Sequence, residues 1–307
     1  MKNGIAIIIG FILVGAMILG WKITEKMDET TSTPVVQNNM GDKKVEFEVP
    51  SMDKVPDGPL GESIKYGEKL MNETDTALDD YVGNGLSCAS CHANGGTVQT
   101  ASPFVGIAAN YPDYRPREAQ VFTLADRVNG CMVRSMNGKE LAYDSKEMQS
   151  MVAYIDYLST GYTIGEDLPW TAGKSAKQFP EPNVDDGEKI YTSSCIACHA
   201  KDGGGTGPTT GPAVWGKDSF NDGAGMARLT KMANYVQKNM PKGQGGTLSD
   251  QDAINVSAYI LTHDRPEWKG HKTDWPKGGR PGDIMNKENR EKVKNGTANY
   301  DEMLKAN

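Results

Sequence analysis

The chain has 307 residues, a formal net charge of −7 and no basic run, which argues against a nucleic-acid partner. Its hydrophobic content is modest at 37%, and it contains 35 Gly, 16 Pro and five Cys. A chain of this length is expected to form about two domains.

The N-terminus predicts export from the cytoplasm. An uncharged apolar run extends from Ile5 to Trp21 and is followed by Lys22. This run is slightly short for the roughly 30 Å hydrocarbon core of a bilayer, so residues 1–24 are either a signal peptide or an uncleaved anchor. The Trp-Lys pair at its end favours a membrane anchor. We therefore expect a periplasmic protein at the outer face of the cytoplasmic membrane, with residues 25–60 as a polar tether.

Four of the five cysteines lie in two copies of one pentapeptide, Cys88-Ala89-Ser90-Cys91-His92 and Cys195-Ile196-Ala197-Cys198-His199. This spacing is typical of c-type haem attachment, because the two thiols can bond the porphyrin vinyl groups while the adjacent imidazole reaches the iron. A zinc site or a redox dithiol is the alternative, but zinc would need two more soft ligands near each copy, and neither segment has them. The sequence therefore predicts two covalently bound haem c groups.

The segments around the two motifs also repeat. Gly67-Glu68-Lys69-Leu70 precedes the first motif and Gly187-Glu188-Lys189-Ile190 precedes the second, whereas Ala153-Tyr154-Ile155 and Ala258-Tyr259-Ile260 follow them. The apolar residues near these segments recur with a helical period. The pattern resembles the class I cytochrome c fold, in which an N-terminal and a C-terminal helix cross. We expect an all-α chain with two tandem class I cytochrome c-like domains.

This repeat divides the chain. We expect the first domain at residues 61–161, a linker at 162–183, the second domain at 184–266 and a tail at 267–307, without long helices until about Asn286.

Each iron needs a sixth ligand to be a six-coordinate electron-transfer centre. In the second domain Met240, which precedes a Pro and Gly loop, is the best candidate, with Met226 and Met232 as alternatives. In the first domain the fifth cysteine, Cys131, follows His92 at nearly the distance that separates Met240 from His199.

Cys131 is therefore the candidate sixth ligand of the first haem, where a thiolate would lower the reduction potential. The alternative is that Cys131 is only a buried packing residue and that Met132 or Met136 binds the iron.

Basic residues surround Cys131, namely Arg115, Arg117, Arg127, Arg134 and Lys139. On a helical wheel Arg117, Arg127, Cys131 and Ser135 share one face, although Gly130 makes a continuous helix doubtful. The arginines either pair with haem propionates or form a pocket for sulfo, carboxylate or phosphate oxygens, to which a hydroxyl adds a donor.

The stretch from Ala125 to Gly138 is similar to the segment around the cysteine haem ligand in the dihaem thiosulfate dehydrogenase/tetrathionate reductase family, and the resemblance covers about residues 60–265. It implies that the chain interconverts thiosulfate and tetrathionate at the first haem. Cys131 would also bond a substrate sulfur, while Arg117, Arg127 and Ser135 would hold sulfonate oxygens. The second haem would exchange electrons with a small c-type cytochrome or another periplasmic carrier. Asn239 resembles members biased towards tetrathionate reduction.

Two other functions compete with this one. A membrane-tethered dihaem electron carrier without its own substrate would give no reason for Cys131 or for the basic segment. The chain is also similar to the cysteine-ligated haem subunit of the periplasmic sulfur-oxidising complex, which needs a separate cytochrome subunit. A second cytochrome domain in the same chain favours the self-contained enzyme.

Overall fold

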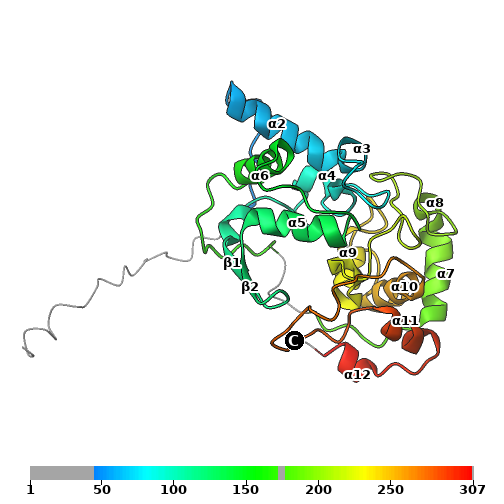
Figure 1. Ribbon diagram of the computed structural model, residues 1–307. Coiled ribbons are helices and arrows are strands. Elements are labelled where there is room, and N and C mark those ends of the chain that lie inside the picture. The colour runs from blue at the N-terminus through cyan, green and yellow to red at the C-terminus, as the bar shows by residue number, and fades with distance from the viewer. Residues whose placement is uncertain (1–44, 172–176, 306–307) are drawn as a thin grey trace, which may run out of the picture. The chain divides into compact units, whose positions relative to one another are not determined.

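A computed structural model describes residues 45–171 and 177–305, which belong to one compact unit (Figure 1). The expected anchor or signal peptide at residues 1–24 lies outside the described residues, as does the tether up to residue 44. Within the ranges described, no helix has both the length and the apolar character to cross a membrane.

The described chain is mostly helical and carries one two-stranded sheet. The longer helices are α2 (Pro59–Asn72), α5 (Leu124–Arg134), α6 (Lys146–Leu158), α7 (Val184–Ser194), α9 (Leu229–Asn239), α10 (Asp250–Thr262) and α11 (Lys287–Lys294). The short helical segments are η1 (Met52–Lys54), α3 (Thr74–Ala77), η2 (Cys88–Ser90), α4 (Ala93–Gly96), η3 (Ile107–Asn110), α8 (Ile196–His199), η4 (Gly225–Ala227) and α12 (Tyr300–Met303). The strands are β1 (Asp113–Arg115) and β2 (Gln120–Phe122).

In the first domain α2 packs across α6 (Figure 1). The buried positions of α2 include Ile64 and Leu70, which lie on one side of the helix. Gly67 lies at the crossing, where an added Cβ would stand 2.0 Å from the carbonyl oxygen of Ser150 and 2.8 Å from the Cβ of Tyr154. The two backbones therefore approach so closely that only glycine fits.

In the second domain α7 packs across α10 in the same way, and α10 also contacts α9. An added Cβ on Gly187 would stand 2.1 Å from the carbonyl oxygen of Asn255 and 2.9 Å from the Cβ of Tyr259. The glycine and tyrosine positions that repeat in the sequence are thus the contact points of two equivalent crossings. The internal repeat is confirmed, and each copy has the crossed helices expected of a class I cytochrome c fold.

Strands β1 and β2 form an antiparallel hairpin, with Tyr114 opposite Val121. The hairpin leads directly into α5. Thr123 caps this helix by accepting a hydrogen bond from the N–H of Asp126, whose carboxylate accepts one from the N–H of Thr123 in return. The chain is mostly helical as expected, and this short hairpin is a local exception, since a tyrosine, a valine and a phenylalanine favour extended backbone here.

Residues 45–60 pack on the first domain, whereas we expected them to belong to a free tether. Phe47 meets Trp170 edge-to-face with a ring separation of 5.2 Å. The hydroxyl of Tyr162 donates to the carbonyl oxygen of Glu46 at 3.0 Å. This packing could not be predicted from the sequence, because one aromatic residue in a polar stretch creates no periodic pattern.

The tail has no helix before α11, as expected, but it is tied firmly to the second domain. The carboxylate of Asp222 accepts from the N–H of Trp268 at 2.6 Å and pairs with His271 at 2.7 Å and with Arg290 at 3.2 Å. Asp222 and Arg290 are almost fully buried. The tail is therefore part of the folded unit.

Candidate active site

Both attachment motifs orient their histidine rings in the same way. Nδ1 of His92 lies 2.5 Å from the carbonyl oxygen of Ser102, and Nδ1 of His199 lies 2.8 Å from that of Pro212. Such a bond fixes the tautomer and leaves Nε2 as the metal-binding atom. Burial lowers the pKa of His92 to about 4, so its imidazole is neutral, as a ligand must be. The residues present fit a haem iron at each motif.

Helix α5 brings Arg127 and Cys131 together. Gly130 does not interrupt the helix, so the two side chains lie one turn apart on the same side. Nη1 of Arg127 donates to Sγ of Cys131 at 3.0 Å. The interaction with Cys131 raises the pKa of Arg127, although burial opposes it. This pair therefore joins a candidate iron ligand to a candidate anion-binding group.

Cys131 lies close to the first attachment motif. The pKa of Cys88 is raised to about 11 and that of Cys91 to about 12, mainly by burial and in part by the nearby Cys131. By contrast, Met132 and Met136 are only 1% and 3% exposed and belong to the apolar core. The packing therefore favours Cys131 over these methionines as the group that faces the first haem.

Ser135 follows α5 with a helical backbone and lies one turn after Cys131. Arg127, Cys131 and Ser135 therefore share one face. Arg117 is not on this helix, because it lies in the turn between β1 and β2. Our helical wheel was wrong for Arg117, since the chain before Thr123 forms a hairpin and not a helical turn.

Instead, Arg117 is bound by a carboxylate of the tail. Its Nε and Nη2 donate to Oδ2 of Asp274 at 2.9 and 2.6 Å, and its guanidinium lies 4.7 Å from the ring centroid of Trp275. Arg134 pairs with the other oxygen of Asp274 at 3.3 Å and with Glu118 at 2.9 Å. These two arginines and two carboxylates neutralise one another beside α5.

In the second domain Met240 directly follows α9 and is partly buried. Met226 is also partly buried, whereas Met232 is 3% exposed within the core. The two histidines outside the motifs are held elsewhere, His263 by a backbone carbonyl and His271 by a carboxylate. Met240 and Met226 thus remain as candidate ligands in this part of the chain.

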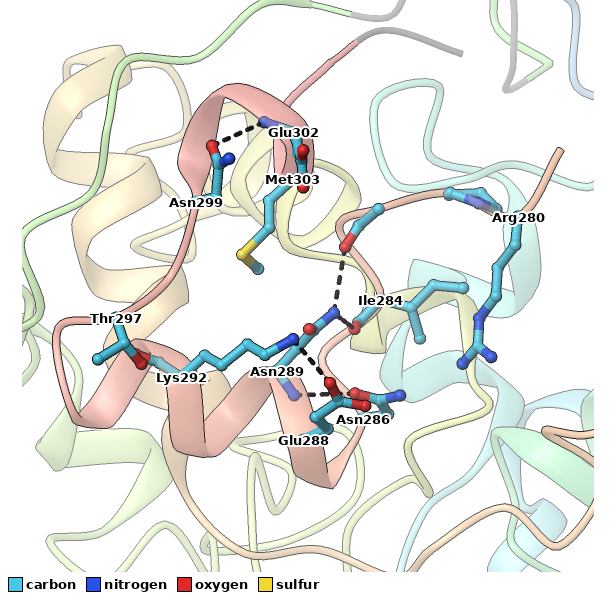
Figure 2. Close-up of a pocket in the computed structure, with 12 residues that line it drawn as sticks. Arg280, Ile284, Asn286, Glu288, Asn289, Lys292, Thr297, Asn299, Glu302 and Met303 are labelled. Atoms are coloured by element: carbon cyan, nitrogen blue, oxygen red, sulfur yellow. Dashed lines mark hydrogen bonds and ion pairs between the residues drawn. The ribbon is translucent and has the colours of Figure 1, made fainter.

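A cavity of about 390 Å³ lies in the tail between α11 and α12 (Figure 2). Its polar groups are largely paired with one another. Lys292 bonds to Glu288, and Asn289 donates to the carbonyl oxygens of Gly282 and Ile284. None of the predicted site residues lines this cavity, so it is not the candidate active site.

Comparison with known proteins identifies the family. A thiosulfate dehydrogenase of Psychrobacter arcticus is 36% identical over 245 residues, which are 78% of this chain and 75% of the relative. One from Allochromatium vinosum is 39% identical over 230 residues, which are 72% of this chain and 85% of the relative. The chain belongs to the thiosulfate dehydrogenase family. This membership confirms the resemblance that the segment around Cys131 suggested.

Other matches agree with membership of the thiosulfate dehydrogenase family. The family model of the SoxA/TsdA cytochrome c domain matches residues 80–164, and that of the cytochrome c oxidase, cbb3-type, subunit III matches residues 182–260. The solved thiosulfate dehydrogenase (TsdBA) of Marichromatium purpuratum, in its as-isolated form, is similar with a TM-score of 0.66 and 33% identity. This match covers 73% of this chain and half of that longer chain. The protein thus has two cytochrome c domains.

The sequence did not predict the carboxylates that pair with Arg117 and Arg134. Asp274 lies far along the chain from the arginines that it binds, in a segment without a periodic pattern. Glu118 stands next to Arg117 in sequence but bonds to Arg134. The net positive charge from Tyr111 to Lys139 indicates only that some of its arginines pair with carboxylates elsewhere in the chain. Asp274 of the tail is one such carboxylate.

Proposed function

We propose that this protein interconverts thiosulfate and tetrathionate at the Cys131 site. Family membership supports the reaction, and the contact between Arg127 and Cys131 is the observation that supports the location. In the oxidative direction two thiosulfate dianions join through a new S–S bond between their terminal sulfurs and release two electrons. In the reverse direction the central S–S bond of tetrathionate breaks as two electrons are taken up.

We assign two covalently bound haem c groups to the two domains. The first would be held by Cys88, Cys91, His92 and Cys131, and the second by Cys195, Cys198, His199 and Met240. When bound, each haem supplies one-electron redox chemistry, so two together match a two-electron couple.

The side chains of α5 would bind and orient the substrate. Cys131 would offer its sulfur as a ligand to the iron and as a partner to the terminal sulfur of the substrate, which is the reacting atom. Arg127 and Ser135 offer donors to the sulfonate oxygens from the same helix face. We retain Arg117 as a further donor through its Nη1, since Asp274 engages Nε and Nη2.

Electrons would be exchanged with a small c-type cytochrome or another periplasmic electron carrier. The cytochrome c domains support a periplasmic location, because haem is attached to such domains outside the cytoplasmic membrane. We propose that residues 1–24 direct export and tether the protein to that membrane.

The reaction can be tested on the purified full-length protein with its haem attached. We expect tetrathionate to oxidise a reduced dye, or thiosulfate to reduce an oxidised one, with two electrons exchanged per tetrathionate. A protein that carries its full haem content but turns over in neither direction would be an electron carrier, and the proposal would be wrong.

A further inference from the structure

The positive charge beside Cys131 is smaller than the sequence suggests. Arg115 pairs with Asp113 at 3.3 Å, Arg117 with Asp274, and Arg134 with both Glu118 and Asp274. Arg127 differs from these arginines, because its guanidinium bonds to the sulfur of Cys131. Among the residues described, it pairs with no carboxylate. A dianionic substrate at this position would meet a single uncompensated guanidinium from the first domain.

Helix α9 of the second domain presents one side to the first domain. Four residues share one face of this helix by their spacing, namely the N-cap residue Arg228 and then Lys231, Tyr235 and Asn239. The buried residues of the helix occupy another face, namely Leu229, Met232, Ala233 and Val236. The side chain of Asn239 accepts from the hydroxyl of Thr100 at 2.7 Å and donates to its carbonyl oxygen at 3.1 Å. Because Thr100 follows the first haem motif closely, these bonds fix this face of α9 beside the first haem loop.

Charges of the first domain, together with Arg228 and Asp283, act on this face of α9. Desolvation by surrounding protein atoms, together with the charges of Arg228, Arg127 and Arg115, lowers the pKa of Lys231 to about 8. Burial likewise raises the pKa of Tyr235, and the charge of Cys91 raises it further. Lys231 therefore lies within electrostatic range of Arg127, and Tyr235 within range of the haem-attachment cysteine.

Lys231 is a cation without a paired anion in the part of the chain that the structure describes. Asp283 is the carboxylate whose charge acts on the pKa of Lys231. Its side chain already accepts hydrogen bonds from Arg228 at 2.8 Å and from the backbone N–H of Thr230 at 3.1 Å. Solvent reaches the Lys231 side chain. Lys231 and Arg127 repel each other unless an anion lies between them, so a dianion relieves an unfavourable interaction as it binds.

We propose that Lys231 is the second cation of the substrate site, and that it binds a sulfonate group of thiosulfate or tetrathionate opposite Arg127. This inference rests on the proposed function of the Cys131 site. It makes the site a joint product of both cytochrome domains, with Arg127 on α5 and Lys231 on α9.

The test uses full-length, haem-loaded protein and the variants Lys231→Gln and Lys231→Arg. Lys189→Gln is the matched control, because Lys189 is an exposed helix lysine of α7 whose loss changes net charge by the same amount. Thiosulfate binding is measured by calorimetry, steady-state KM and kcat are measured by dye assay, and the midpoint potentials of the haems are measured by redox titration.

We expect Lys231→Gln to weaken thiosulfate binding and raise KM about 10-fold with little change in kcat, because it removes a charge-assisted bond. Lys231→Arg and Lys189→Gln should stay within about twofold of the unmodified protein. Equal binding by Lys231→Gln and Lys189→Gln would overturn the inference. So would a shifted midpoint potential with unchanged thiosulfate binding, since Lys231 would then pair with a haem propionate.

These results separate the two proposals. A protein that binds thiosulfate through Lys231 but turns over in neither direction would contradict the proposed function alone. A protein that is active but insensitive to Lys231→Gln would contradict this inference alone. Failure to bind thiosulfate at all would contradict both.

Discussion

The bond between Arg127 and Cys131 joins the proposed iron ligand to the proposed anion-binding arginine. A guanidinium beside a thiolate stabilises the negative charge on sulfur and still presents other N–H groups outwards. Under the proposed function, the same side chain would both stabilise Cys131 as an iron ligand and orient a sulfonate.

Replacing Arg127 by Gln should lower kcat/KM about 10- to 100-fold, because one charge-assisted donor is lost beside the reacting sulfur. The measurement is a steady-state assay on protein with unchanged haem content. Arg280→Gln, at an exposed position of the tail, is the control and should stay within about twofold. Equal rates for both variants would show that Arg127 has only a structural role.

Asp274 should contribute to stability, since it neutralises two poorly exposed arginines. Its side chain is 4% exposed, and those of Arg117 and Arg134 are 20% and 12% exposed. Asp274→Asn should lower the free energy of unfolding by about 2–4 kcal/mol. Asp218→Asn, which breaks an exposed pair with Lys217, should cost less than about 0.5 kcal/mol in the same urea titration. Similar losses in both variants would contradict this account of the cluster.

Periodicity and motif spacing explain which site residues the sequence could predict. Arg127, Cys131 and Ser135 are spaced by one helical turn each, so a helix places them together whatever surrounds it. The position of Arg117 could not be predicted in this way, because it depends on a hairpin and on a carboxylate from the tail. Helical periodicity around Cys131 could not point to Lys231, because Lys231 lies in the other domain.

The two helix crossings account for the repeated glycines. At each crossing the neighbouring backbone lies where a Cβ would be, so an alanine would have to push the helices apart.

Gly67→Ala should therefore lower the free energy of unfolding by about 1–3 kcal/mol, despite alanine's better helix propensity. Gly225→Ala is the control, since an added Cβ there meets nothing within 4 Å. Thermal unfolding followed by circular dichroism would measure both. If Gly67→Ala were as stable as Gly225→Ala, the close approach of α2 and α6 would be wrong.

Helix α5 shows where local sequence signals fail. Gly130 disfavours a helix by about 1 kcal/mol relative to alanine. Burial of Val128 and Met132 on the inner side of α5 outweighs that cost, and the helix continues to Arg134. By contrast, the start of α10 follows from a local signal, since Ser249 accepts a hydrogen bond from the N–H of Asp252 and capping depends only on neighbouring residues.

The tail attachment predicts an acid-sensitive contribution to stability. Burial alone would raise the pKa of Asp222, but His271, Trp268 and Arg290 together hold it below its ordinary value of 3.8. A carboxyl with a lowered folded-state pKa stabilises the fold above its unfolded value, and this stabilisation is lost as the pH falls through the folded-state pKa. The difference in unfolding free energy between the unmodified protein and Asp222→Asn should thus be larger at about pH 6 than at about pH 3. A difference that grew on acidification would contradict this assignment.

Among the residues that the structure describes, several sets of bonds join the domains, including those of Asn221 with Val133 and Asn137. The hydroxyl of Ser90, inside the first haem motif, donates to the carbonyl oxygen of Pro208 at 2.6 Å. Asn239 bonds to Thr100, and the tail reaches the first domain through Asp274. Such contacts between distant segments have no signature in sequence periodicity, which explains why the sequence predicted two domains but not how they combine.

These contacts predict cooperative unfolding. We expect tryptophan fluorescence, which reports mainly on the second domain and the tail, to change at the same urea concentration as far-ultraviolet circular dichroism. Two separated transitions would show that the domains are independent, and would weaken the case for a site shared between α5 and α9.

The central claim is that Cys131 is the reacting centre of a thiosulfate–tetrathionate enzyme, and comparison of the unmodified protein with Cys131→Gly tests it most directly. Both haems must remain attached, and Met240→Leu serves as a control that perturbs the second haem. We predict that Cys131→Gly lowers the rate in both directions at least about 100-fold, while Met240→Leu shifts a midpoint potential and retains thiosulfate binding. Unchanged tetrathionate-dependent dye oxidation by Cys131→Gly would contradict the account.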